Sequence, residues 1–244
     1  MVKKVESPWA SGPAEILQHA VWLLSKDSDT NRRLAMILTD NAVEQMIKTY
    51  LSLPKRVTGI KISRNRYQEI SENFPALLDA LEEFAPEKLE GIDLGSIEWY
   101  HRLRNELYHQ GMGLTVERDK VEIYAELANV LFRNLFGAEP PGKISDEAEL
   151  LGRFIKLWGR LENAMTETAS RHSLLGLRPR QFLDATRFLR GANLMPDDIY
   201  RDVTKYRQLR NLAIHGQADY KELLKKDVVE RLEEIVKKYE EEVG

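Results

Sequence analysis

Apolar residues recur at intervals of three and four along most of the chain, and this spacing restricts the fold more than any other feature of the sequence. It places apolar side chains on one face of an amphipathic helix. Alternation with a period of two, which would indicate strands, is nearly absent. We therefore expect an all-α protein with helices over residues 14–26, 30–53, 67–84, 96–109, 120–136, 146–171, 180–189, 197–215 and 220–242.

The helical series is interrupted between residues 137 and 142, where Pro140 and Pro141 prevent a continuous helix. The sequence therefore predicts a domain boundary at this point, with one helical domain over residues 1–139 and a second over residues 140–244. A chain of 244 residues is long enough to hold two small domains.

Three short signatures occur in the same order in both halves. They are DNAV at 40–43, LDA at 78–80 and RNELYH at 104–109, then ENAM at 162–165, LDA at 183–185 and RNLAIH at 210–215. Random order would give about 0.02 copies of Arg-Asn-x-x-x-His, so two copies indicate a duplicated unit. Duplication of a purely structural helix pair is the alternative. The first copy carries a basic insertion at about residues 54–66.

Each Arg-Asn-x-x-x-His motif ends a helix. His109 is followed by Gln110 and Gly111, and His215 is followed by Gly216, the residue type that commonly stops helices. The negative end of the helix dipole favours a charged imidazole, so we expect the pKa of both histidines to rise towards neutral pH. Such groups can both accept and donate a proton.

Polar stripes at four-residue spacing accompany the motifs. They consist of His101, Asn105 and His109 in the first half, and of Arg207, Asn211 and His215 in the second. Buried polar groups need polar partners. Docking one stripe against the other would supply them, and would place two arginines and two histidines around one site.

Two histidines and two guanidinium groups suit transesterification of RNA. One histidine would deprotonate the 2′-hydroxyl, the other would protonate the leaving 5′-oxygen, and arginine would stabilise the growing phosphate charge. This chemistry requires no metal and no cofactor, and we expect none. The products would be a 2′,3′-cyclic phosphate and a 5′-hydroxyl. DNA lacks the nucleophile and should resist cleavage.

The R-x4-H pattern at a helix end, with a D/E-N-A element on an earlier helix, resembles the HEPN superfamily of all-helical domains. The resemblance implies two HEPN-like bundles that form an intramolecular pseudo-dimer and a composite endoribonuclease site, with RNA as substrate, a role as a toxin or defence effector, and an antitoxin or regulatory partner. It assigns catalytic positions to Arg104, His109, Arg210 and His215, and supporting positions to Asn105, Asn211, Asp40, Asn41, Glu162 and Asn163.

Two features qualify this resemblance. Some HEPN proteins bind nucleotide, RNA or a partner protein without cutting, so a non-catalytic binding module is the alternative. HEPN toxins that are silenced by adenylylation have a tyrosine two places after the motif histidine, where this chain has Gly111 and Gln217. We therefore do not expect that mode of control.

The net charge of −3 argues against a broad electrostatic surface for nucleic acid, so RNA contacts should be local. The insertion is either a phosphate-contacting loop or an ordinary solvated one. The residues expected to contact RNA are Lys55, Arg56, Lys61, Arg64, Arg66 and Arg207.

The absence of cysteine excludes disulfides, thiolate metal sites and a cysteine nucleophile. No apolar run is long enough to cross a membrane, and the charged start of the chain is unlike a secretory leader. We therefore expect a cytoplasmic protein that makes no membrane contact, either as a monomeric pseudo-dimer or as a homodimer.

Overall fold

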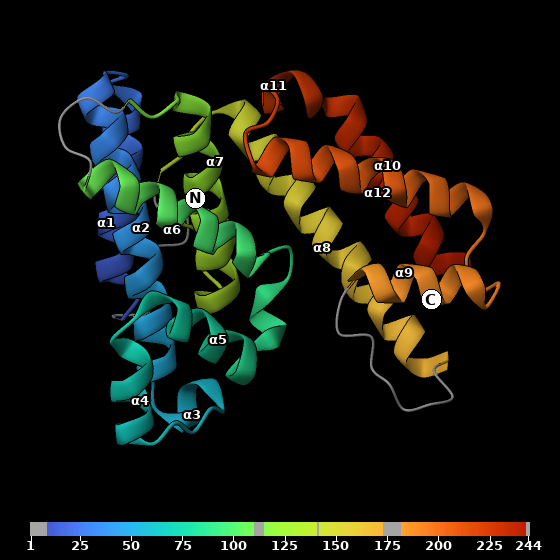
Figure 1. Cartoon of the computed structure of the whole chain (residues 1–244), viewed down its shortest axis with the longest axis horizontal. Coiled ribbons are helices and arrows are strands. Elements are labelled where there is room, and N and C mark those ends of the chain that lie inside the picture. The colour runs from blue at the N-terminus through green and yellow to red at the C-terminus, as the bar shows by residue number, and fades with distance from the viewer. Residues whose placement is uncertain (1–8, 110–114, 141, 173–181, 243–244) are drawn as a thin grey trace. The chain divides into compact units, whose positions relative to one another are not determined.

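The computed structural model of the chain describes residues 9–109, 115–140, 142–172 and 182–242 (Figure 1). Over these ranges the chain forms helices and no β-strand, which confirms the all-α class. No helix in the described ranges is both long and apolar enough to span a membrane. The chain divides into two compact units, residues 1–152 and residues 153–244.

The first unit contains α1 to α7 and the start of α8. Its helices are α1 (Ser11–Ser25), α2 (Asp29–Ser52), α3 (Lys55–Thr58), α4 (Arg64–Ser71), α5 (Phe74–Phe84), the 3-10 helix η1 (Pro86–Leu89), α6 (Leu94–His109) and α7 (Arg118–Phe136). The short helices α3 and α4 lie at the C-terminal end of α2 (Figure 1).

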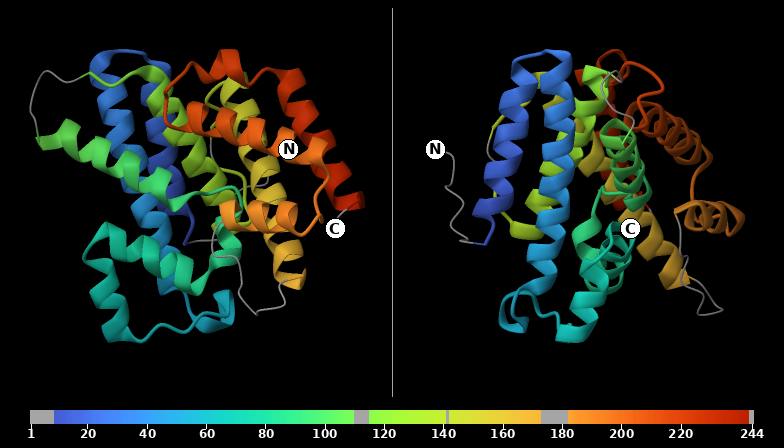
Figure 2. Two further views of the ribbon diagram at one scale, coloured as in Figure 1. Left: turned by 45° about the vertical axis from the view of Figure 1, so that its right-hand side comes forward. Right: turned by 60° about the vertical axis from the view of Figure 1, so that its left-hand side comes forward.

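Helix α2 is the central element of the first unit. It forms an antiparallel hairpin with α1 (Figure 2) and also packs against α5, α6 and α7. Ser28 begins the helix, because its side chain accepts a hydrogen bond from the Asn31 backbone N–H at 3.2 Å. Most of the apolar positions of α2 are buried, including Met36, Val43 and Ile47, whereas Leu34 near its start is exposed. This burial follows the three-and-four spacing that predicted the helix.

The second unit is built on α8 (Asp146–His172), α9 (Phe182–Gly191), α10 (Asp197–Ile214), α11 (Tyr220–Leu223) and α12 (Lys226–Glu242). Arg153 pairs with Glu233, and Arg160 holds Glu240 with two bonds of 2.6 Å. Arg160 follows Arg153 along α8 by the same number of residues as Glu240 follows Glu233 along α12. The two helices therefore run side by side in the same direction. Trp158, Tyr206 and Tyr239 are buried in this unit.

Two predicted helices are each broken into two. The predicted helix 67–84 is divided into α4 and α5, because the Asn73 side chain accepts from the Ala76 N–H at 2.8 Å and Pro75 has no N–H to give. The predicted helix 220–242 is divided into α11 and α12 at Leu224, which has a non-helical backbone. The first two residues of the predicted helix 180–189 lie outside the described residues.

Helix α8 begins within the first unit and continues into the second. Its first turns, up to Gly152, pack on α7 at the buried Glu126. Asn129 donates to Glu126 Oε2 at 2.9 Å, and Arg133 donates to Glu126 Oε1 at 3.3 Å. The predicted boundary at residue 140 therefore precedes α8, whereas the two compact units meet at residue 152 within the helix.

Replacement of Gly152 by alanine should destabilise the protein by about 1–3 kcal/mol, because the core has no room for the added methyl. An added Cβ would lie 2.1 Å from Glu126 Oε1 and 2.9 Å from its Cδ, and Glu126 is held by Asn129 and Arg133. Urea unfolding measures the loss. Gly12→Ala in α1 is the matched control, because an added Cβ there meets no heavy atom within 4 Å. Equal midpoints for the two variants would contradict this packing.

Burial raises the pKa of Glu126 from 4.5 to about 7, although Asn129 and Arg133 lower it. The folded state therefore holds the proton more tightly than the unfolded state. The stability gained from this proton is complete below about pH 4.5 and is lost as the pH rises to about 7. Glu126→Gln should flatten the stability profile over this window, measured by urea unfolding. Parallel profiles for the two proteins would disprove the assignment.

Candidate functional site

The first motif lies on the last turns of α6, where Arg104 is held by two neighbours. Its Nη1 donates to the side-chain oxygen of Asn105 at 2.8 Å. Its Nε lies 3.1 Å from Oδ2 of Asp40, at an angle that makes the contact an ion pair and not a linear hydrogen bond. His109 is the last residue of α6, and its side chain lies outside the described part, as does Gly111.

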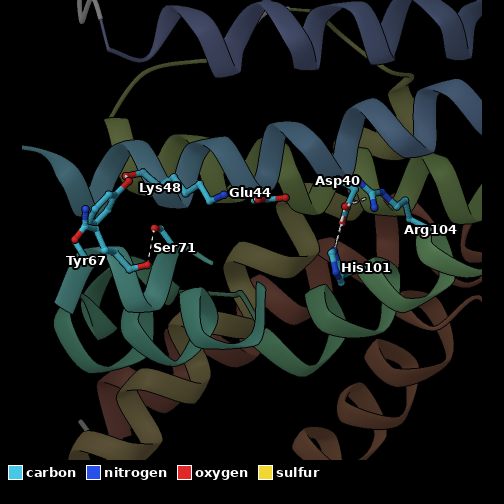
Figure 3. A network of polar contacts seen from close by, with 8 residues as sticks. Asp40, Glu44, Lys48, Tyr67, Ser71, His101 and Arg104 are labelled. Carbon is cyan, nitrogen blue, oxygen red and sulfur yellow. Dashed lines mark hydrogen bonds and ion pairs between the residues drawn. The ribbon is translucent and has the colours of Figure 1, made fainter. Parts of the chain in front are cut away.

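Asp40, on α2, is fully buried and has partners on α6 and α7. Figure 3 shows its contacts with His101 and Arg104 of α6. His101 Nδ1, on α6, lies 3.0 and 3.1 Å from the two carboxylate oxygens, and Tyr124, on α7, donates to Oδ1 at 2.9 Å. An ionised carboxylate only accepts hydrogen bonds, so Nδ1 of His101 carries its proton. A buried charge is costly unless it is paired and hydrogen-bonded; Arg104 supplies the ion pair, and His101 and Tyr124 supply hydrogen bonds.

Aromatic rings hold the partners of Asp40 in place. Phe74 stacks on the His101 ring, with centroids 4.0 Å apart and planes at 11°. Tyr100 stacks on Tyr124, with centroids 4.7 Å apart. Burial raises the pKa of Tyr124 well above its usual range, and the charge and hydrogen bond of Asp40 raise it further. Tyr124 therefore stays protonated and keeps its donor on Asp40.

The second motif has the same local geometry at the end of α10. Arg210 Nη1 donates to the side-chain oxygen of Asn211 at 3.2 Å. The helix ends at Ile214 with His215 as its C-cap, and Gly216 adopts the left-handed backbone that terminates helices, with φ of 59°. Arg207 lies one turn earlier on α10 and is half-buried.

The arginine-to-asparagine bond has a geometric consequence in both motifs. An arginine five residues before a histidine lies about 140° from it around a helix, whereas an asparagine four residues before lies about 40° from it. By bonding to Asn105 or Asn211, each guanidinium turns towards the helix face that carries the histidine. Each motif therefore turns a cation towards the helix face on which its histidine position lies, and a cation there suits a phosphate.

The supporting acidic elements of the two units differ. Asp40 is buried and Asn41 is half-buried on α2, whereas Glu162 is half-buried and Asn163 is exposed on α8. The structure therefore brings Asp40 to Arg104 and His101, and shows Asn163 at the surface. His101 has a polar partner within its own unit, the carboxylate of Asp40.

The basic residues of the insertion lie at the surface of the first unit. Arg66 is close to two carboxylates, at 3.6 Å from Glu69 and 3.7 Å from Glu83. All five are exposed: Lys55, Arg56, Lys61, Arg64 and Arg66.

Tyr124 and Phe74 contribute to the site but were not identified from the sequence. Tyr124 lies within the apolar run of α7, and Phe74 begins α5, so neither belongs to a repeated signature. In the described ranges, no group of three or more His, Asp or Glu side chains is arranged to hold a metal ion.

Comparisons with known proteins gave no relative. No family model matches the chain, and neither the curated proteins nor the solved structures contain a match.

Neutralising Asp40 should destabilise the first unit, because Arg104 and His101 would lose the buried carboxylate that pairs with them. We expect Asp40→Asn to lower the free energy of unfolding by about 3 kcal/mol or more. The measurement is urea unfolding at neutral pH.

Glu44→Gln is the matched control, since Glu44 lies one turn further along α2 and pairs with Lys48 at 2.6 Å in a partly exposed position. Its loss should cost about 1 kcal/mol or less. A loss at Asp40 no larger than that at Glu44 would show that the buried network contributes little.

Proposed function

We propose that this chain is a metal-independent endoribonuclease of the HEPN type, in which Arg104, His109, Arg210 and His215 act on one scissile phosphate. The supporting observation is the geometry common to both motifs. Arg104 and Arg210 each donate from Nη1 to the asparagine that follows, at 2.8 and 3.2 Å, and the motif histidine is the last residue of α6 in one unit and the C-cap residue of α10 in the other. A structural duplication alone would not require this polar geometry to recur.

In the proposed reaction, one histidine removes the proton of the 2′-hydroxyl as its oxygen forms a bond to phosphorus. The P–O5′ bond breaks, and the other histidine gives its proton to the leaving oxygen. The two guanidinium groups stabilise the charge that grows on the non-bridging oxygens. The products are a 2′,3′-cyclic phosphate and a 5′-hydroxyl, so the electrons and protons balance without another reactant.

The proposal requires the two motifs to share one phosphate, either within a single chain as a pseudo-dimer or between the chains of a homodimer. The basic insertion and Arg207 would then contact the RNA backbone. A cytoplasmic role as a toxin or defence effector, restrained by an antitoxin or regulatory partner, is part of the same proposal.

A second candidate function is a non-catalytic module that binds nucleotide, RNA or a partner protein. It is favoured by the engagement of Arg104 with Asp40 and Asn105, because a guanidinium that braces a buried carboxylate can be structural. This candidate predicts binding without turnover.

The nuclease proposal predicts cleavage of single-stranded RNA in the presence of EDTA, with cyclic phosphate ends. His109→Ala and His215→Ala should each lower kcat by about 100- to 10,000-fold, because each removes one proton-transfer group. The measurement is the cleavage rate of an end-labelled RNA, with product ends identified by mass spectrometry. A 2′-deoxy substrate should remain uncut.

His19→Ala is the control, because His19 is exposed on α1 outside both motifs. Circular dichroism establishes that the variants are folded. Cleavage that survives in the folded double variant would exclude this site, and RNA binding with no cleavage by the unmodified chain would favour the binding module.

A further inference from the structure

A hollow of about 310 Å³ lies in the first unit between the end of α2 and the basic insertion. Its apolar lining includes Leu51, Leu53, Ile60 and Ile62. Tyr67 on α4 forms another part of the wall. The volume falls at the lower end of the range for small-molecule sites, about 300–1,000 Å³.

Three of the five basic residues of the insertion line the hollow. Lys55, Lys61 and Arg64 line it, whereas Arg56 and Arg66 do not. None of these three lies within ion-pair distance of a carboxylate in the described ranges, whereas Arg66 lies near Glu69 and Glu83. Three cations around one hollow repel each other, and an anion placed among them relieves that repulsion.

The walls are held by contacts within the unit. The Tyr67 hydroxyl donates to the backbone oxygen of Lys48 on α2 at 3.1 Å, which fixes the ring. Gly59 has a left-handed backbone with φ of 78°, and its N–H donates to Lys55 O at 2.7 Å, which closes the short helix α3. A site formed before binding loses less conformational entropy when a ligand enters.

We propose that this hollow binds one nucleotide of a single-stranded RNA, with the phosphate between Lys55, Lys61 and Arg64 and the base against Tyr67 and the apolar residues. Cations for the backbone combined with an aromatic surface for the base are the usual features of single-strand recognition. This inference rests on the proposed ribonuclease function and defines a substrate subsite away from the reacting phosphate.

Helix α2 connects this subsite to the catalytic motif of the first unit. Figure 3 shows Asp40, Glu44 and Lys48 in line along α2, with Tyr67 at the Lys48 end. Leu51 follows Asp40 by eleven residues, or about 16 Å along the helix axis. The intervening carboxylate of Glu44 is neutralised by Lys48 at 2.6 Å. The hollow and Asp40, the ion-pair partner of Arg104, therefore lie along the same helix.

The test is calorimetric titration of the full chain carrying His109→Ala and His215→Ala, in EDTA, so that binding is measured without cleavage. The probes are adenosine 5′-monophosphate, inorganic phosphate, adenosine and a 2′-O-methyl oligonucleotide. We expect the monophosphate to bind more tightly than phosphate or adenosine. Lys61→Glu and Arg64→Glu should each weaken its binding by about tenfold or more, because each reverses a charge at the phosphate.

Two charge reversals provide matched controls. Lys26→Glu lies on the exposed end of the first hairpin, and Arg56→Glu lies in the insertion but outside the hollow. Arg56→Glu should weaken binding of the monophosphate no more than Lys26→Glu does. An equal loss for Arg56 and Lys61 would show diffuse attraction and overturn the subsite. Equal affinities for phosphate and the monophosphate would reduce it to an anion site, which also overturns the proposal.

Tyr67→Leu tests the base contact, because it removes the ring and retains an apolar side chain. This substitution should weaken binding of the monophosphate and leave the binding of inorganic phosphate unchanged. The two proposals can fail separately. If the chain binds the monophosphate as expected but never cuts RNA, the subsite stands and the ribonuclease proposal fails. If the chain cuts RNA but does not bind the monophosphate, the ribonuclease proposal stands and the subsite fails.

Discussion

The first unit depends on neutralising one carboxylate, that of Asp40, which has no contact with water. An unpaired charge in that position would make folding unfavourable, so its partners must be in place for α2, α6 and α7 to pack. Those partners are His101, Arg104 and Tyr124. The motif arginine is therefore positioned by the same contact that holds three helices together, and the proposed catalytic site and the core share one requirement.

The acidic residues of the repeated signature have different surroundings in the two units. In the first unit the acidic residue of the signature is buried against the motif helix, and in the second Glu162 is half-buried on α8. The second unit has surface ion pairs between α8 and α12, such as Arg160 with Glu240. The arginine-to-asparagine bond is nevertheless present in both. The arginine-to-asparagine geometry is therefore common to the two motifs, whereas the burial of the acidic residue differs.

The sequence predicted the long helices well because their apolar faces are buried. The break before α5 was readable from Asn73 and Pro75, but the break at Leu224 has no glycine or proline to mark it. The repeat indicated that Asp40 supports the motif, but not that its other partners would be His101 and Tyr124. Contacts between residues far apart in sequence, such as Gly152 on Glu126, depend on packing that no local pattern encodes.

Helix α8 has a consequence for any attempt to separate the two units. Its start is stabilised by Ser145, whose hydroxyl accepts from the Ala148 N–H at 3.0 Å, and its first turns belong to the first unit. A cut at residue 152 would leave the remainder of the helix without that cap, with several backbone donors exposed. A cut at residue 145 would remove from α7 the segment that covers Glu126. The two units are thus distinct in their packing, but helix α8 belongs to both, and no cut within or before it leaves both units intact.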